Sequence, residues 1–233
     1  MMVDKRKFKD INVSLLGLGT MRLPCETEQK RESNPNIDYD KAQSLVDLAY
    51  KNGVNYFDTA YMYHCGKSEA FIGYALKKYP RDTYFIADKL PIWLCDTKED
   101  MKRVFDEQLE RTGMDYFDFY LCHAMNRERM DWLEKYEVMP ALCRLKEEGK
   151  IRHLGFSFHD TPDVLEELLN RYQWDFVQIQ LNYLDWEFQD AKQQYEIIDN
   201  HGLPVWVMEP CRGGRLASLS PEADKVLSTA QPD

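Results

Sequence analysis

The sequence predicts an α/β fold in which parallel strands alternate with amphipathic helices. Three observations carry this prediction. Short apolar segments alternate with helical periods along the chain, glycines close helices at Gly53, Gly149 and Gly202, and no linker interrupts the alternation. Strands separated by helices of ten or more residues pair in parallel through right-handed crossovers, and glycine is common just after a helix. With 44% hydrophobic residues among 233, the chain can also bury a sizeable core.

The first half of the chain contains four predicted strands, each followed by a helix. The strands cover residues 13–18, 56–58, 84–87 and 117–121. The helices cover residues 39–51, 68–78, 97–111 and 130–148. In the first helix Ala42, Val46 and Ala49 recur on one face, and Ser68 stands where an N-cap would begin the second.

The second half contains three further strands, over residues 153–156, 176–179 and 204–207. Helices over residues 162–171 and 189–200 lie between them. Two segments depart from this alternation. Residues 3–11 are expected to form a small hairpin, and the polar residues 25–38, which include Pro35, are expected to be an insertion or a mobile loop.

Two architectures fit seven such strands: an open doubly wound sheet and a closed barrel of eight β/α units. The near-even spacing favours the (β/α)8 TIM barrel. An eighth strand is expected after Pro221, but the sequence ends at Asp233. We therefore predict that residues 1–233 form a single barrel domain whose last β/α unit is missing from this chain.

Charge and cysteine content exclude several functions. The net charge of −10 repels phosphate backbones, so no nucleic-acid partner is expected, and no apolar run reaches the roughly 18 residues of a membrane span. The six cysteines form no C-x-x-C pair, so no metal site is predicted. We expect them to stay reduced and the protein to be cytoplasmic.

The candidate catalytic residues follow consecutive strands. Asp58 ends the second strand and Tyr63 lies five residues further on, while Lys89 and His123 follow the third and fourth strands. Singly, each has an ordinary explanation: a turn cap, a packed tyrosine, a surface lysine, a half-buried histidine. In a parallel barrel, however, the carboxyl ends of all strands meet at one rim. We therefore expect the four side chains to lie together.

This set of side chains suits the reduction of a carbonyl group. A carbonyl that accepts a hydride also needs a proton on its oxygen, and tyrosine, with an ordinary pKa near 10, is a weak acid. The ammonium of Lys89 would lower the pKa of Tyr63, and Asp58 would hold that ammonium in place. His123 would donate a hydrogen bond that orients the substrate oxygen.

Several motifs resemble those of the aldo-keto reductases. They are G-L-G-T-M-R-L (17–23), G-V-N-Y-F-D-T-A-Y-M-Y (53–63), K-L-P (89–91), L-C-H (121–123), G-K-I-R-H-L-G-F-S (149–157) and Q-I-Q-L-N-Y (178–183). The resemblance covers nearly the whole chain. Within the family, the chain is similar to a bacterial branch whose members often add a C-terminal ferredoxin-like segment. It implies a TIM barrel, a small-molecule carbonyl substrate, and NADP or NAD bound without a Rossmann domain.

The resemblance also implies which residues bind the cofactor. Ser157 and Gln178 match positions that hold the nicotinamide carboxamide. The other residues expected to bind the cofactor are Gly19, Thr20, Met21, Met208, Pro210, Arg212, Gly214 and Leu216. Met208 stands where the family commonly has an aromatic residue, and Phe158 and His159 follow Ser157 where an asparagine is usual. The unit that holds the adenine and ribose phosphate is missing, which leaves NAD and NADP both open.

Three functions are compatible with these residues. The first is NAD(P)H-dependent reduction of aldehydes or ketones to alcohols, with Tyr63 as proton donor. The second is an aldolase-type lyase in which Lys89 forms a Schiff base. The third is a sensor or subunit that binds a nicotinamide nucleotide without turnover. The sequence indicates neither the physiological substrate nor the oligomeric state.

Overall fold

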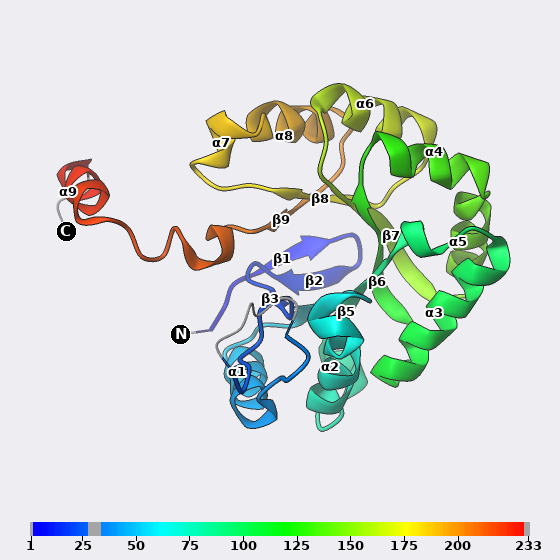
Figure 1. Ribbon diagram of the computed structural model, residues 1–233, viewed down its shortest axis with the longest axis horizontal. Helices are drawn as coiled ribbons and strands as arrows, with labels where there is room; N and C mark the ends of the chain where they lie inside the picture. The colour runs from blue at the N-terminus through cyan, green and yellow to red at the C-terminus, as the bar shows by residue number, and fades with distance from the viewer. Residues whose placement is uncertain (1, 28–33, 231–233) are drawn as a thin grey trace.

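The computed structural model describes residues 2–27 and 34–230, and its central feature is a curved sheet of seven parallel strands (Figure 1). Neighbouring strands in the sheet are also neighbours in sequence. The strands are β3 (Leu18–Gly19), β4 (Tyr56–Asp58), β5 (Phe85–Leu90), β6 (Phe117–Met125), β7 (Ile151–Phe158), β8 (Phe176–Gln180) and β9 (Val205–Met208). The predicted (β/α)8-barrel class is confirmed, with seven of its parallel strands among the described residues.

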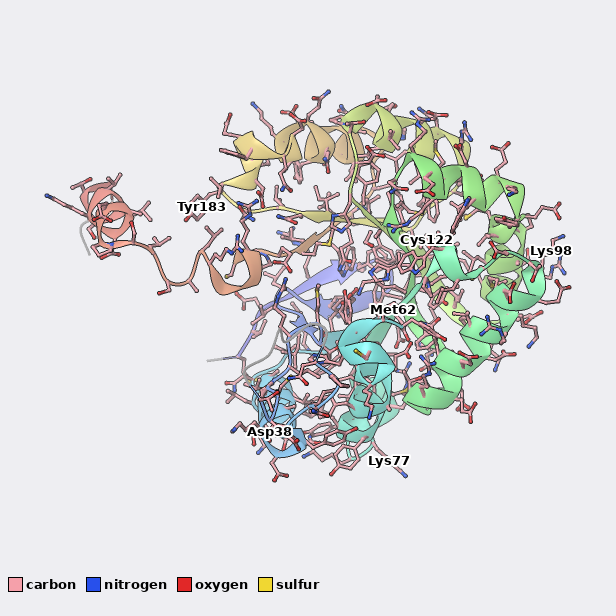
Figure 2. The ribbon with its side chains drawn as sticks, viewed as in Figure 1. Asp38, Met62, Lys77, Lys98, Cys122 and Tyr183 are labelled. Atoms are coloured by element: carbon pink, nitrogen blue, oxygen red, sulfur yellow. The ribbon has the colours of Figure 1, made fainter. Side chains whose placement is uncertain are left out.

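Helices cover the outer, convex side of this sheet (Figure 1). They are α1 (Tyr39–Lys51), α2 (Ser68–Leu76), α3 (Lys98–Thr112), α4 (Arg127–Lys135), α5 (Val138–Glu147), α6 (Pro162–Arg171), α7 (Asp185–Phe188) and α8 (Ala191–Asn200). Lys77, directly after α2, and Lys98, at the start of α3, point away from the sheet (Figure 2). A further helix, α9 (Pro221–Ala230), lies apart from the sheet (Figure 1). No helix in the described part of the chain has the length and apolar character needed to cross a membrane.

The predicted strand over residues 13–18 is wrong, because two different elements share that apolar run. Strand β2 (Ile11–Ser14) pairs antiparallel with β1 (Lys5–Phe8), and the parallel sheet begins only at Leu18. At the end of β2, the Ser14 N–H donates to Asn55 Oδ1, and the Asn55 N–H donates to Ser14 Oγ. The hairpin expected near residues 3–11 is confirmed. A loop was also expected over residues 25–38. Its residues 28–33 lie outside the described residues.

Three predicted helices also differ from the structure. The helix over residues 130–148 is in fact α4 and α5, separated at Glu137, whose φ of 48° is left-handed. Ser68 does not cap α2, because its hydroxyl instead bonds the Thr59 hydroxyl at 2.9 Å and the Thr20 hydroxyl at 2.6 Å. The helix predicted from residue 189 begins at Ala191, after the single turn of α7.

The strands direct alternate side chains to the two sides of the sheet, as the pleat requires. One set fills a floor inside the barrel, made of Phe8, Val13, Tyr56, Ala87, Phe119, Leu121 and Phe176. Gly155 makes room for this floor, because a Cβ there would lie 2.6 Å from the Phe176 carbonyl oxygen and 2.7 Å from its ring. Two residues beyond Tyr56, Ala87 and Leu121 come Asp58, Lys89 and His123. The alternation therefore points these three side chains inward, above the floor.

The opposite faces of the strands pack against the helices, where two carboxyl groups are fully buried. Asp88 of β5 and Glu69 of α2 each have one carboxyl oxygen with no hydrogen-bond partner among the described residues. Burial and the nearby charge of Glu69 raise the pKa of Asp88 well above its usual range, and burial raises that of Glu69 despite its bond to Arg111. We infer that one proton held between the two carboxyl groups satisfies both orphaned oxygens.

The first prediction concerns Gly73 of α2. A Cβ at this position would lie 2.1 Å from the carbonyl oxygen of Thr112 at the end of α3, a backbone atom that cannot move aside alone. Gly73→Ala should therefore lower the free energy of unfolding by about 1–3 kcal/mol, as overpacking does, although alanine favours helices. Urea denaturation measures the change. Lys77→Ala, at an exposed position beside α2, is the control, and an equal or stabilising effect of Gly73→Ala would contradict the close approach.

The second prediction concerns the proton shared by Asp88 and Glu69. A carboxyl group whose folded-state pKa is raised stabilises the fold below its unfolded pKa, and this contribution is lost as pH rises through the folded pKa. In Asp88→Asn the side chain stays neutral at every pH. The free energy of unfolding of this variant, relative to that of the native chain, should therefore increase from pH 5 to pH 8. Urea unfolding at both pH values tests this, with the exposed Asp82→Asn as control. A pH-independent difference would show that the proton is not held there.

Candidate active site

The side chain of Lys89 lies at the centre of the predicted site. It is 2% exposed, and its ammonium Nζ donates to Asp58 Oδ1 at 2.5 Å, to the Thr59 carbonyl oxygen at 2.7 Å and to Tyr63 Oη at 3.3 Å. All three ammonium hydrogens thus have an acceptor. Strands β4 and β5 are direct neighbours in the sheet, which brings Lys89 to Asp58.

Tyr63 reaches Lys89 because a strained turn follows β4. The short 3₁₀ helix from Tyr63 to Gly66 contains His64 and Cys65 with φ of 51° and 55°, both in the left-handed region. The buried His64 ring holds this turn, since its Nε2 accepts the Leu23 N–H at 3.1 Å and its Nδ1 bonds the Asn34 carbonyl oxygen at 2.7 Å. The Tyr63 hydroxyl is therefore placed by the segment that follows β3.

The electrostatics keep Lys89 charged and Tyr63 protonated. Burial alone would lower the pKa of Lys89, but the charge of Asp58 and the contact with Tyr63 raise it above its ordinary value. Burial raises the pKa of Tyr63, and Lys89 offsets only part of that increase. Asp58 holds the ammonium as predicted, but the predicted net lowering of the pKa of Tyr63 is wrong, because burial disfavours the phenolate more than the ammonium of Lys89 stabilises it.

His123 faces Tyr63 across the site. The two ring centroids are 6.0 Å apart at 83°, and the Trp93 ring lies 5.4 Å from the His123 ring. Burial, followed by the charge of Lys89, lowers the pKa of His123 well below 6.5, so the imidazole is neutral. Its Nδ1 has no hydrogen-bond partner among the described residues.

An irregularity in β6 orients His123. The pairing with β7 shifts register between Cys122 and Met125, and Ala124 between them has a left-handed φ of 54°. The Ala124 N–H donates to Ser157 Oγ at 2.7 Å. Since this hydroxyl accepts from the backbone, its own hydrogen is free to donate to another group.

Most of the proposed cofactor residues line two adjoining cavities at this rim. One, of about 660 Å³, is lined by Tyr63, Lys89 and His123 together with Met21, Ser157, Gln178, Met208 and Arg212. The other, of about 1140 Å³, adjoins β3 and β9, and its lining includes Asp58, Tyr63, Gly19, Met21, Gln178, Met208, Pro210 and Gly214. Among the described residues no group of three His, Cys, Asp or Glu side chains is placed to hold a metal ion.

The side chains of Ser157 and Gln178 fit the carboxamide that the resemblance assigns to them. Gln178 Oε1 is buried without a donor, and its Nε2 lies 3.4 Å from Asp58 Oδ2. A carboxamide offers an NH₂ donor and a carbonyl acceptor, and these complement the orphaned Gln178 oxygen and the free Ser157 hydrogen.

Two of the proposed cofactor residues are not brought to either cavity. Thr20 is fully buried, and its hydroxyl donates to the Asp58 carbonyl oxygen at 3.0 Å and accepts from Ser68. This side chain supports β4 instead of facing the site. Leu216 is half-buried beyond the Arg212–Gly214 turn and lines neither cavity.

Other residues at this rim were not predicted from the sequence. Arg22 forms an ion pair with Glu209, which joins the segments after β3 and β9, and the buried carboxylate of Asp185 lies 3.3 Å from the predicted Arg212. Arg129 lies over Trp93 beside His123. Glu209 directly follows β9, and this position was its only signal in the sequence, whereas Arg22 lies three residues after β3.

Comparison with known proteins points to one family. The sequence model of the "Aldo/keto reductase family" matches residues 15–232. The chain is 32% identical over 190 residues to L-galactose dehydrogenase of Arabidopsis thaliana, covering 78% of this chain and 59% of that protein. It is 28% identical over 224 residues to NADH-specific methylglyoxal reductase of Escherichia coli, covering 89% of this chain and 66% of that protein. The chain thus spans about three fifths to two thirds of these relatives.

Solved structures agree with this result. The holo form of an aldo-keto reductase from Bacillus halodurans superposes with a TM-score of 0.71 at 29% identity, covering 91% of this chain and 68% of that chain. A thermostable aldo-keto reductase in complex with the inhibitor epalrestat gives a TM-score of 0.75 at 26% identity, with 97% and 78% covered.

Proposed function

Because the chain belongs to the aldo/keto reductase family, we propose that it reduces aldehydes or ketones to alcohols with NADPH or NADH. The observation that supports this most strongly is the triad of contacts around Lys89, which joins a charged ammonium to a carboxylate and a phenol. The Escherichia coli relative is described as NADH-specific, so both nicotinamide cofactors stay within the proposal.

Each catalytic side chain has a separate task. When bound, the reduced nicotinamide supplies the hydride that adds to the carbonyl carbon. Tyr63 gives its hydroxyl proton to the carbonyl oxygen, and Lys89 stabilises the phenolate that this leaves. Asp58 holds the ammonium 2.5 Å away. The neutral His123 donates a hydrogen bond to the same carbonyl oxygen and orients it.

The cofactor half of the site is supported by placement and chemistry. Ser157 and Gln178 would hold the carboxamide, with Gly19, Met21 and Met208 along the same cavities. The turn from Arg212 to Gly214, whose glycines have φ of 65° and 95°, would direct the Gly213 N–H and the charge of Arg212 at the pyrophosphate, since the N–H groups of Arg212 and Gly214 already donate within the turn. We assign no such role to the side chains of Thr20 and Leu216.

The Schiff-base alternative has less support. A Schiff base needs a neutral lysine amine, but Lys89 has a raised pKa and three acceptors that hold it as an ammonium. The sensor alternative differs from the reductase only in turnover. We also propose that the protein works as one domain in the cytoplasm, where cysteine thiols stay reduced.

The third prediction tests the proton donor. Tyr63→Phe removes the hydroxyl and keeps the ring, so kcat for a panel of aldehydes and ketones should fall by about 10²–10⁴-fold, the usual contribution of general acid catalysis. Cofactor fluorescence should report unchanged NADPH or NADH binding. Tyr74→Phe, on the outer face of α2, is the control. Full activity in Tyr63→Phe would exclude Tyr63 as the acid, and binding without any turnover by the native chain would favour the sensor.

A further inference from the structure

Arg129 of α4 differs from the other half-buried arginines of the described chain, because no carboxylate lies within 4 Å of it. Each of the others contacts an acidic side chain: Arg22 pairs with Glu209, Arg81 with Asp118, Arg111 with Glu69 and Arg212 with Asp185. Burial lowers the pKa of Arg129, and Glu128 acts on it only at a distance. A partly desolvated guanidinium without a counter-ion is unfavourable unless something else supplies one.

The guanidinium lies over Trp93, whose ring neighbours that of His123. Its centre lies 4.5 Å from the Trp93 ring centroid, and that ring lies 5.4 Å from the His123 ring. One nitrogen, Nη1, donates to the carbonyl oxygen of Ala124, the residue next to His123. The other guanidinium nitrogens donate to no acceptor in the described chain, and none of them is enclosed. They are therefore available to a ligand.

Arg129 adds positive charge beside two histidines of the site, although the whole chain has a net charge of −10. The charge of Arg129 contributes to the lowered pKa of both His123 and His159, which places the three groups within one field, and Lys89 adds to it at His123. Glu209 also acts on His159, but its carboxylate is already paired with Arg22. Lys89 is likewise paired with Asp58, so an anion bound here would offset the charge of Arg129, which has no carboxylate partner in the described chain.

We propose that the site takes carbonyl compounds that carry a carboxylate or phosphate group, and that Arg129 binds this group. The inference rests on the proposed reductase function and adds the substrate class. A guanidinium is planar and presents paired N–H donors that match both anions. A substrate whose carbonyl oxygen is held by Tyr63 and His123 would place its anionic group on the Trp93 side of His123, where Arg129 lies over the Trp93 ring.

The fourth prediction compares matched substrates. Kinetics would be measured with 4-oxobutanoate against its uncharged methyl ester, and with glyceraldehyde 3-phosphate against glyceraldehyde. In at least one pair, the native chain should have a higher kcat/KM for the anionic substrate than for its uncharged counterpart. The pair with the larger ratio shows whether Arg129 binds a carboxylate or a phosphate. In Arg129→Met this preference should fall by about 10–100-fold, mainly through KM, as expected for a lost charge-assisted hydrogen bond. Arg129→Lys should keep part of it.

Arg127→Met is the matched control, because Arg127 lies on the same helix, is exposed and pairs with Glu167. This variant should keep the native preference. An equal loss for charged and uncharged substrates in Arg129→Met, seen in kcat, would overturn the proposal, since Arg129 would then only hold the Ala124 carbonyl. Native turnover with no preference in either pair would also overturn it. No turnover of any substrate would instead reject the reductase function.

Discussion

The ion pair between Lys89 and Asp58, inside a barrel and above an aromatic floor, is the constraint on which the site depends. An ammonium that is 2% exposed is tolerated only where acceptors replace water, and here a carboxylate, a backbone carbonyl and a phenol do so. Removing Asp58 would leave an unpaired buried charge. The ion pair with Asp58 keeps Lys89 charged, and this charge is what stabilises the phenolate that Tyr63 leaves after proton transfer.

The fold supplies this geometry through the two-residue period of its strands. Tyr56, Ala87 and Leu121 belong to the floor, and two residues later the same faces present Asp58, Lys89 and His123. Gly155 allows the Phe176 ring to complete that floor, and Ser157 and Gln178 follow these two residues in the same way. Packing below the site and chemistry within it are therefore consecutive inward-facing layers of one barrel.

Sequence patterns predicted what depends on local periods and strand ends. The limits of α1 and α6 were predicted to the residue, and the four candidate catalytic residues meet as expected. The break at Glu137 was missed although Pro140 signalled it, since proline belongs in the first turn of a helix. No sequence signal distinguishes Thr20, whose hydroxyl is used within the fold, or Arg129, whose significance lies in the carboxylate it lacks. Such properties arise only when distant segments pack together.

The most direct test of the account is the pH dependence of the hydride-transfer rate, followed by cofactor absorbance in a single turnover. Tyr63 has a pKa raised above 10.0 and His123 one lowered well below 6.5. With Tyr63 as the acid, the rate should stay constant through neutral pH and fall only in the alkaline range, where the phenol ionises. A rate that instead increases about tenfold per unit as pH falls through 6.5 would assign the proton to a histidine and contradict the account.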